Sequence, residues 1–375
     1  MPKEQTEKET QVISSSKIES MKGVDVDNDA IIKQSIIHEV GEEAYQFISS
    51  KIDSLSGETL FTSTNTRFNI DRLATGKFKN IVNLKRINDF RWVNKYFEAV
   101  NAKIPRGGIF INSFESYISR KNRILQKSIS PFNWIHYTID VLFTRVFPKL
   151  PLTKQFYFFI TKGKGRVLSK AETFGRLYSC GFEVCDERMI NDEVYFVARK
   201  IKDPVFDFNP TYGLLIRLRR YGKNGELFNV YKLRTMHAYS EYLQEYVFER
   251  NRLQEGGKFK DDFRITTEGK IFRKFWLDEV PMLYNVLKGQ MKIVGVRPLS
   301  QQYFNLYTEE LKQKRIKYKP GLIPPFYADM PKTLEEIMES EMRYLDAYEK
   351  APFRTDVSYF FKAWNNILFK KARSR

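Results

Sequence analysis

Two adjacent carboxylates stand among basic residues in the C-terminal half of the chain. Asp278 and Glu279 lie in the segment RKFWLDEVPML, where Pro281 predicts that a helix begins. Asp278 is either an N-cap that stabilises this helix or an ionised carboxylate that acts as a nucleophile. In the second case the adjacent carboxylate of Glu279 could hold a divalent cation.

Cationic side chains near this pair predict an anionic substrate. Arg273 and Lys274 precede the two carboxylates, and Arg297 follows them. Such side chains can neutralise phosphate oxygens, and the free backbone N–H groups at a helix N-terminus also attract anions.

A second basic segment lies upstream. Gly222 and Gly225 predict a hairpin turn that aligns two basic strands. Lys232 and Arg234 would then project from the same face, because alternate strand residues share a side. An exposed basic edge strand explains this pattern without any ligand, and the spacing alone leaves that interpretation open.

These motifs, in this order, resemble the bacterial sugar transferase family of monotopic polyprenyl-phosphate phosphoglycosyltransferases. The resemblance covers residues 212–375 and rests on four phrases: RYGKNGELFNVYKLRTM, DFRITTEGKIFRKFWLDEVPMLYNVLKGQMKIVGVRP, KPGL and EMRYLDAYEKAPFRTDVSYFFKAW. It implies a ping-pong reaction that starts lipid-linked exopolysaccharide, capsule or glycoconjugate synthesis. A UDP-sugar would give its phosphosugar to an aspartate and release UMP, and undecaprenyl phosphate would then take the phosphosugar.

The resemblance also implies roles for single residues. Asp278 matches the nucleophile, and Glu279 would orient this dyad or hold Mg²⁺ with it. The physical chemistry agrees, because phosphoryl transfer depends on in-line positioning and charge neutralisation more than on acid–base groups.

Further site residues follow from the matched motifs. Lys232, Arg273 and Arg297 match positions that contact phosphates, whereas Arg234 is either a phosphate contact or a structural ion-pair partner. The loop expected to contact the substrate contains three residues: Lys319, Pro320 and Gly321.

The chain departs from the family in three places, of which the change to Val296 before Arg297 is minor. The family normally carries a hydrophobic re-entrant hairpin directly before the basic hairpin, but residues 195–212 contain several charged side chains, so we expect none there. The family's usual Thr-Gly after the K-P-G-L motif is replaced near Pro324 and Pro325, which removes backbone donors. This loop is therefore expected to bind a different sugar or none.

An enzyme without that hairpin needs another route to its lipid acceptor. We expect a peripheral enzyme, with no transmembrane helix, on the cytoplasmic face of the bacterial inner membrane. Basic residues near an anionic leaflet contribute about 1 kcal/mol each, and the aromatic-basic region 134–160 could lie in the interface. The alternative for that region is a helix packed inside the first domain.

Residues 75–200 resemble the C-terminal half of class I S-adenosylmethionine-dependent methyltransferases. The similar phrases are NIVNLKRIN, PRGGIFINSFES, LSKAETFGRLYSCGFEV and EVYFVARK. Such enzymes hold their cofactor on a glycine-rich turn, and residues 36–78 contain no G-x-G. We therefore expect a degenerate, Rossmann-like scaffold with a mostly parallel sheet.

Composition sets the limits for these expectations. The 375 residues are 42% hydrophobic and carry a net charge of +18, which excludes a wholly disordered chain and indicates anionic partners. Two cysteines exclude a disulfide scaffold, and the N-terminus has no signal-peptide pattern. We expect an α/β protein with a disordered tail (1–35), a methyltransferase-like domain (36–203) and an α+β sugar transferase domain (204–375).

Other functions remain in competition. A non-catalytic scaffold of a glycan-assembly complex is the main alternative, and an active methyltransferase is the next. No zinc finger, helix-turn-helix or RNA-recognition motif supports nucleic-acid binding. The sugar is not encoded in any motif, and a homodimer is left open.

Overall fold

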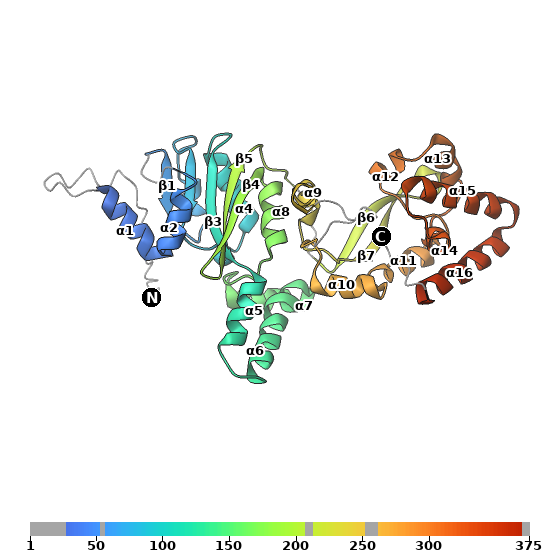
Figure 1. Ribbon diagram of the computed structural model, residues 1–375, viewed down its shortest axis with the longest axis horizontal. Coiled ribbons are helices and arrows are strands. Elements are labelled where there is room, and N and C mark those ends of the chain that lie inside the picture. The colour runs from blue at the N-terminus through green and yellow to red at the C-terminus, as the bar shows by residue number, and fades with distance from the viewer. Residues whose placement is uncertain (1–27, 53–56, 207–212, 252–261, 370–375) are drawn as a thin grey trace, which may run out of the picture. The chain divides into compact units, whose positions relative to one another are not determined.

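The computed structural model describes residues 28–52, 57–206, 213–251 and 262–369 (Figure 1). These residues form two compact units. The N-terminal unit comprises the described residues of Met1–Pro210 together with Ala238–Gln244, and the C-terminal unit comprises those of Thr211–His237 and Glu245–Arg375.

A five-stranded sheet organises the N-terminal unit, in the order β1-β2-β3-β5-β4. Its strands are β1 (Thr59–Thr62), β2 (Asn80–Asn83), β3 (Ile109–Glu115), β4 (Phe182–Ile190) and β5 (Glu193–Lys200). The first three pair in parallel, whereas β5 runs antiparallel to both β3 and β4. The expected α/β class is confirmed, and the sheet is mixed: β1, β2, β3 and β4 run in one direction, and β5 alone runs against them. The reason is local: Asn191 and Asp192 both take positive φ and close a tight β4–β5 hairpin.

Helices α1 (Asn28–Val40) and α2 (Glu42–Ser49) begin the described chain. The expectation of a disordered tail up to residue 35 is therefore wrong from Asn28 onward, and residues 1–27 lie outside the described part. Ile36 is fully buried and Ile32 packs against the same core, with Phe47 and Ile111. Apolar burial of this kind stabilises a helix whose own sequence signal is weak.

The remaining helices of this unit cover the sheet or extend from it. Those within the α/β part are α3 (Phe68–Asp71), η2 (Ile87–Asp89), α4 (Val93–Lys103) and α8 (Lys170–Ser179). Between β3 and α8 the chain makes a helical excursion, residues 117–165. Its elements are α5 (Tyr117–Gln126), α6 (Phe132–Val141), η3 (Leu142–Val146), η4 (Phe147–Lys149) and α7 (Pro151–Thr161).

The C-terminal unit combines two small sheets with short helices. The antiparallel hairpin is β6 (Leu215–Tyr221) and β7 (Leu227–Leu233), joined by η5 (Lys223–Gly225), and the parallel pair is β8 (Lys292–Val294) and β9 (Gly321–Ile323). After η6 (Ser240–Leu243) and α9 (Gln244–Asn251), the site helices are α10 (Thr267–Lys274), η7 (Leu277–Glu279) and α11 (Met282–Leu287). The last helices are α12 (Gln301–Asn305), α13 (Glu309–Ile316), α14 (Phe326–Asp329), α15 (Leu334–Lys350) and α16 (Pro352–Phe369).

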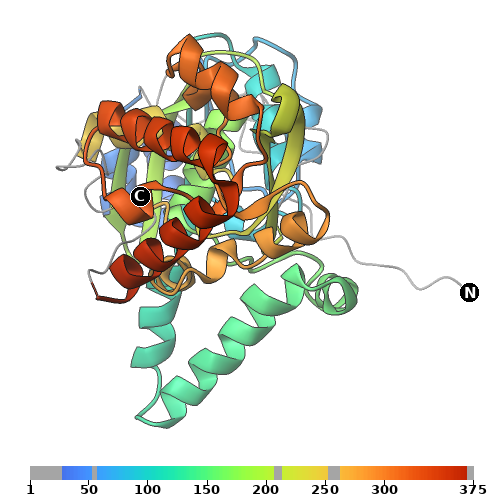
Figure 2. The same ribbon diagram turned by 90° about the vertical axis from the view of Figure 1, so that its right-hand side faces the viewer.

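The core of the C-terminal unit lies where α15 packs on the β8–β9 pair. Val294, Leu311, Tyr344 and Leu345 are buried together there. Helices α15 and α16 follow one another and pack together (Figure 2). Among the described residues, no helix is both long and apolar enough to span a bilayer.

Candidate active site

The basic hairpin forms as the glycine spacing predicts. Asn224 and Gly225 both take positive φ in the turn, which suits the right-handed twist of the two strands. Arg217 pairs with Tyr231 and Ile216 with Lys232, so Lys232 lies near the end of β7. Arg234 follows directly after the strand, and its backbone N–H bonds the carbonyl of Leu214.

One buried amide fixes this strand to the helix that follows the acidic pair. Asn285 of α11 is fully buried. Its side chain accepts from the N–H of Tyr231 at 3.1 Å and donates to the carbonyl of Asn229 at 2.7 Å. The sequence reasoning missed Asn285, although an amide inside the apolar run MLYNVL is a signal, because buried amides need hydrogen-bond partners.

Asp278 and Glu279 lie together in the single turn η7, before α11. Trp276 begins this turn in the left-handed conformation, with φ of 60°, and its ring packs on Tyr327 at 4.2 Å between centroids. Pro281 precedes α11, and no side chain caps that helix. The interpretation of Asp278 as an N-cap is therefore wrong.

The two carboxylates are buried but have different partners. Glu279 forms an ion pair with Lys232, with 2.7 Å between Nζ and Oε1. Asp278 is only 7% exposed, and its Oδ1 is a buried oxygen with no hydrogen-bond partner among the described residues. A buried carboxylate oxygen without a donor is costly, so this atom is a candidate to meet a ligand.

The surroundings of Asp278 also shift its pKa. Burial raises the pKa of Asp278 above its ordinary value, and the neighbouring negative charge of Glu279 adds to this rise. Lys232 and Arg273 act in the opposite direction on the same pKa. A cation that approaches Asp278 therefore stabilises the ionised form of its carboxylate.

Arg273 reaches the site from the last turn of α10. Its Nε donates to Thr235 Oγ1 at 3.0 Å, and burial lowers the pKa of the guanidinium. The helix packs very closely on the segment that follows β7: a Cβ on Gly269 would lie 2.0 Å from the carbonyl oxygen of Thr235. Thr266 caps α10 through a 2.8 Å bond from the N–H of Gly269.

Four predicted residues thus converge: Asp278, Glu279, Lys232 and Arg273. The structure places the others among different neighbours. Arg234 donates to the carbonyl of Gly213 at 3.1 Å. Arg297 lies after β8, 5.9 Å from the ring centroid of Phe326, and its positive charge adds to the burial that lowers the pKa of Arg220.

The predicted substrate loop is held by backbone contacts. Pro320 accepts from the N–H of Lys292 at 2.9 Å, and a Cβ on Gly321 would lie 2.1 Å from the nitrogen of Gly295. Lys319 Nζ lies near Gly289. Pro325 precedes the first residue of α14, where its missing N–H costs nothing.

The two carboxylates fit a magnesium ion that is held partly by the protein and partly by substrate phosphates. No group of three or more metal-binding side chains occurs in the described residues. Mg²⁺ is commonly held by one or two carboxylates together with phosphates and water. Asp278, with its unpartnered oxygen, and the adjacent Glu279 match that pattern.

Comparison with known proteins identifies the C-terminal region. A family model for the bacterial sugar transferases matches residues 206–370, which contain all four converging residues. A galactosyl transferase of Streptococcus agalactiae is 34% identical over 34% of this chain and 29% of its own length. An uncharacterized sugar transferase of Bacillus subtilis is 35% identical over 37% of this chain and 57% of its own length.

A third relative has a more specific name. An undecaprenyl-phosphate galactose phosphotransferase of Salmonella typhimurium is 38% identical over 28% of this chain and 23% of its own length. The chain therefore spans between about a quarter and somewhat over half of the length of these relatives. Residues 206–370 of the chain therefore match the bacterial sugar transferase family.

Proposed function

We propose that the protein transfers a phosphosugar from a UDP-sugar to undecaprenyl phosphate, through a covalent intermediate on Asp278. One observation carries the proposal: a buried carboxylate oxygen has no partner, beside two cations, in the region that matches the family. The names of three relatives as galactose or N-acetylgalactosamine transferases to a lipid carrier support this reaction class.

The first half-reaction uses Asp278 as the nucleophile. A carboxylate oxygen forms a bond to the phosphorus that carries the sugar, and the bond from this phosphorus to the bridging oxygen breaks. UMP leaves with the bond electrons. Lys232 and Arg273 would neutralise the charge that develops on the phosphate oxygens.

The second half-reaction regenerates the enzyme. An oxygen of undecaprenyl phosphate bonds to the same phosphorus, and the bond between phosphorus and the Asp278 oxygen breaks. Neither half-reaction needs a proton from the protein. Mg²⁺, held by Asp278 and Glu279, would supply further charge neutralisation at the phosphates.

This reaction has to occur at a membrane surface, because its acceptor is a lipid. We propose a peripheral position on the cytoplasmic face of the bacterial inner membrane, which a net charge of +18 favours. In this proposal the N-terminal unit is a degenerate methyltransferase-like scaffold.

Release of UMP tests the reaction. The full chain is incubated with a panel of UDP-sugars, Mg²⁺ and undecaprenyl phosphate in lipid nanodiscs. Asp278→Asn should abolish acceptor-dependent release, whereas Glu339→Gln, which changes an exposed carboxylate, should leave it intact. Absence of release from every donor, by a folded wild-type protein, would favour the non-catalytic scaffold instead.

A further inference from the structure

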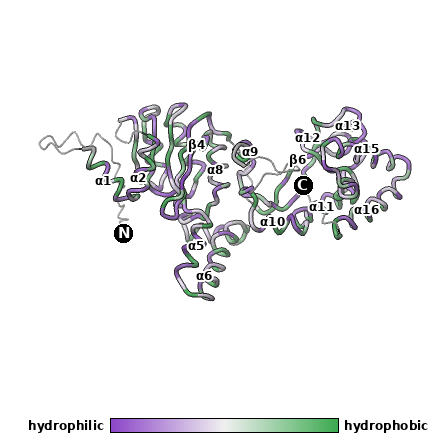
Figure 3. Tube along the Cα trace, in the orientation of Figure 1, coloured by the Kyte–Doolittle hydropathy of each residue, from purple (hydrophilic) through white to green (hydrophobic). Residues whose placement is uncertain are grey.

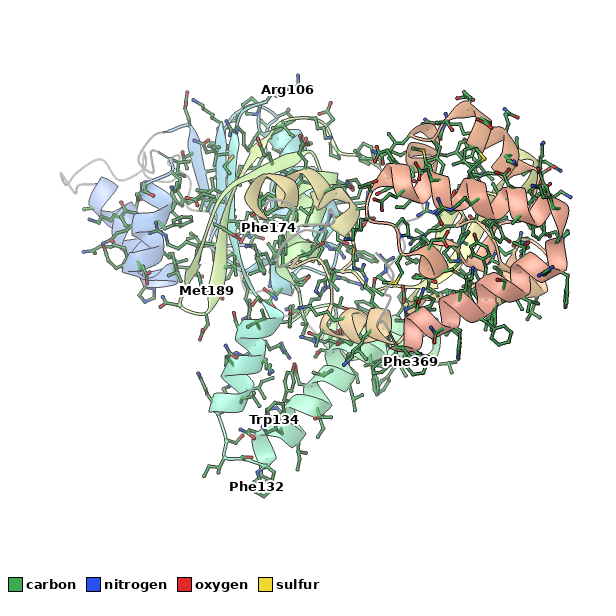
Figure 4. The ribbon with its side chains drawn as sticks, turned by 45° about the vertical axis from the view of Figure 1, so that its right-hand side comes forward. Arg106, Phe132, Trp134, Phe174, Met189 and Phe369 are labelled. Carbon is green, nitrogen blue, oxygen red and sulfur yellow. The ribbon has the colours of Figure 1, made fainter. Side chains whose placement is uncertain are left out.

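The helical excursion, residues 117–165, exposes much of its apolar surface. Three of its side chains, Ile129, Leu152 and Phe159, are 84%, 93% and 82% exposed. Helix α6 has no buried residue at all. Figure 4 shows Phe132 and Trp134 on α6, at the end of the excursion that is distant from Phe174 of α8. The alternative that this region packs inside the first domain is therefore wrong for α6.

The excursion nevertheless has its own internal order. Phe143 packs on Tyr157 at 5.4 Å between ring centroids and on Phe147 at 5.8 Å, and Tyr157 is buried. Phe143 and Phe147 therefore belong to the inside of the excursion. The outward-facing apolar residues take no part in this small core.

A cluster of ion pairs connects the excursion to the sheet. Glu115, at the end of β3, is buried and pairs with Arg123 at 2.6 Å and with Arg86 at 3.7 Å. Arg120 lies 4.0 Å from the same carboxylate and forms a 2.6 Å pair with Asp140 of α6. These pairs hold α5 and α6 in place while the outer faces stay apolar.

The positive charge of the excursion favours an anionic partner. Residues 117–165 contain nine lysines and arginines and one acidic residue, Asp140, which Arg120 neutralises. A second copy of this surface would meet it with the same positive charge and be repelled. Figure 3 shows hydrophobic stretches along α6. Exposed apolar side chains flanked by cations fit the boundary between the headgroups and acyl chains of an anionic bilayer.

We propose that the helical excursion is the element that binds the protein to an anionic lipid surface. It would lie in the plane of the interface, since its helices are too short to cross a bilayer. The aromatic rings of Trp134 and Tyr137, each within 6 Å of Lys121 Nζ, suit the headgroup level. This proposal deepens the proposed function, because it assigns membrane contact to a unit other than the one with the candidate active site.

Flotation with vesicles tests the assignment. The full chain is mixed with phosphatidylcholine vesicles, with and without phosphatidylglycerol. Wild type should float with the anionic vesicles and be released by salt. The triple variant Ile129→Ser, Leu152→Ser, Phe159→Ser should bind them at least about tenfold more weakly, because it removes apolar area. Changing Phe68 and Trp92, exposed apolar residues elsewhere in this unit, to Ser should have no such effect.

A direct contact can be measured in parallel. Brominated lipids should quench tryptophan fluorescence in wild type, and Trp134→Phe should remove most of this quenching. Flotation of the triple variant at the wild-type level, or failure of wild type to bind anionic vesicles, would overturn the proposal.

The proposed reaction can be tested independently of lipid binding. Asp278→Asn should float normally but release no UMP, and the triple variant should still release UMP with an acceptor dispersed in detergent. If wild type floats and no variant or donor gives UMP, the lipid-binding proposal stands and the reaction is wrong.

Discussion

The ion pair between Lys232 and Glu279 is the contact on which the acidic pair depends. Both side chains are largely buried, at 16% and 8% exposure. Removing one partner of such a pair leaves a buried charge without compensation, which costs more than the pair itself contributes. Lys232 also counteracts the raised pKa of Asp278. One lysine therefore supports both the stability and the ionisation of the site.

Lys232→Met should lower the free energy of unfolding by about 3–5 kcal/mol. Adding Glu279→Gln should recover part of this loss, because the uncompensated charge disappears, but should not restore UMP release. Urea unfolding of the two single variants and the double variant measures the coupling. Equal, additive losses from the single changes would contradict the ion pair.

Burial of Asp278 predicts a pH signature in stability. Its folded-state pKa is raised, so its contribution to stability is fully present below the unfolded pKa and is lost as pH rises through the folded pKa. Asp278→Asn should therefore be more stable than wild type at neutral pH, and the difference should shrink toward acid pH. Thermal unfolding across this range measures the trend. A variant less stable than wild type at neutral pH would contradict it.

Activity should show the matching dependence. The nucleophile has to be ionised, so UMP release should fall on acidification at a pH above that expected for an ordinary aspartate. Loss of a nearby cation raises the pKa of Asp278 and so moves the acid limb of the pH–activity profile to higher pH. Arg273→Gln should therefore shift the acid limb upward as well as slow the reaction, whereas a change in sugar contacts alone would leave the limb in place.

At the scale of elements, close backbone approaches decide several contacts. A Cβ on Gly175 of α8 would lie 2.2 Å from the carbonyl oxygen of Tyr239, in the segment Ala238–Gln244 that packs within the N-terminal unit. Arg176 stacks on the Tyr239 ring at 4.5 Å, and Asn94 donates to its hydroxyl at 2.9 Å. This segment begins two residues after Met236, where the phrase RYGKNGELFNVYKLRTM ends.

Gly175→Ala should displace this segment, because backbone atoms cannot move aside as a flexible side chain can. We expect a loss of about 1–3 kcal/mol in stability and faster proteolysis around residues 238–244. Gly57→Ala is the matched control, since a Cβ there meets no atom within 4 Å. Proteolysis of Gly175→Ala at the rate of the control would show that the segment is not held by α8.

The elements also show what the sequence could and could not predict. The glycines at 222 and 225 predicted the basic hairpin, and Gly225 takes the positive φ that the turn requires locally. The antiparallel β4–β5 pairing and helix α1 were missed, since they depend on a two-residue turn without glycine and on burial against distant strands. Tertiary contacts, not local propensity, decided both.

At the scale of the whole chain, motif order predicted the site better than composition did. The four converging residues come from two phrases that the resemblance had already aligned, yet neither the Lys232–Glu279 pair nor the isolation of the Asp278 oxygen follows from spacing. A net charge of +18 indicated anionic partners without choosing among them. The helical excursion, with nine lysines and arginines against one acidic residue, carries a net +8 of this charge.

Two ligands can separate the roles of the two units within the intact chain. A ligand that binds only the folded state stabilises it by roughly 2.7 kcal/mol at 100 times its dissociation constant. UMP with Mg²⁺ should therefore raise the melting temperature by several degrees, since it is the leaving group of the proposed reaction. S-adenosylmethionine should not, because residues 36–78 lack the glycine-rich turn that lets a backbone approach that cofactor.

AMP serves as the control for phosphate binding alone. An equal shift with S-adenosylmethionine would overturn the degenerate interpretation of the N-terminal unit, and an equal shift with AMP would remove the selectivity for uridine that the proposed donor requires.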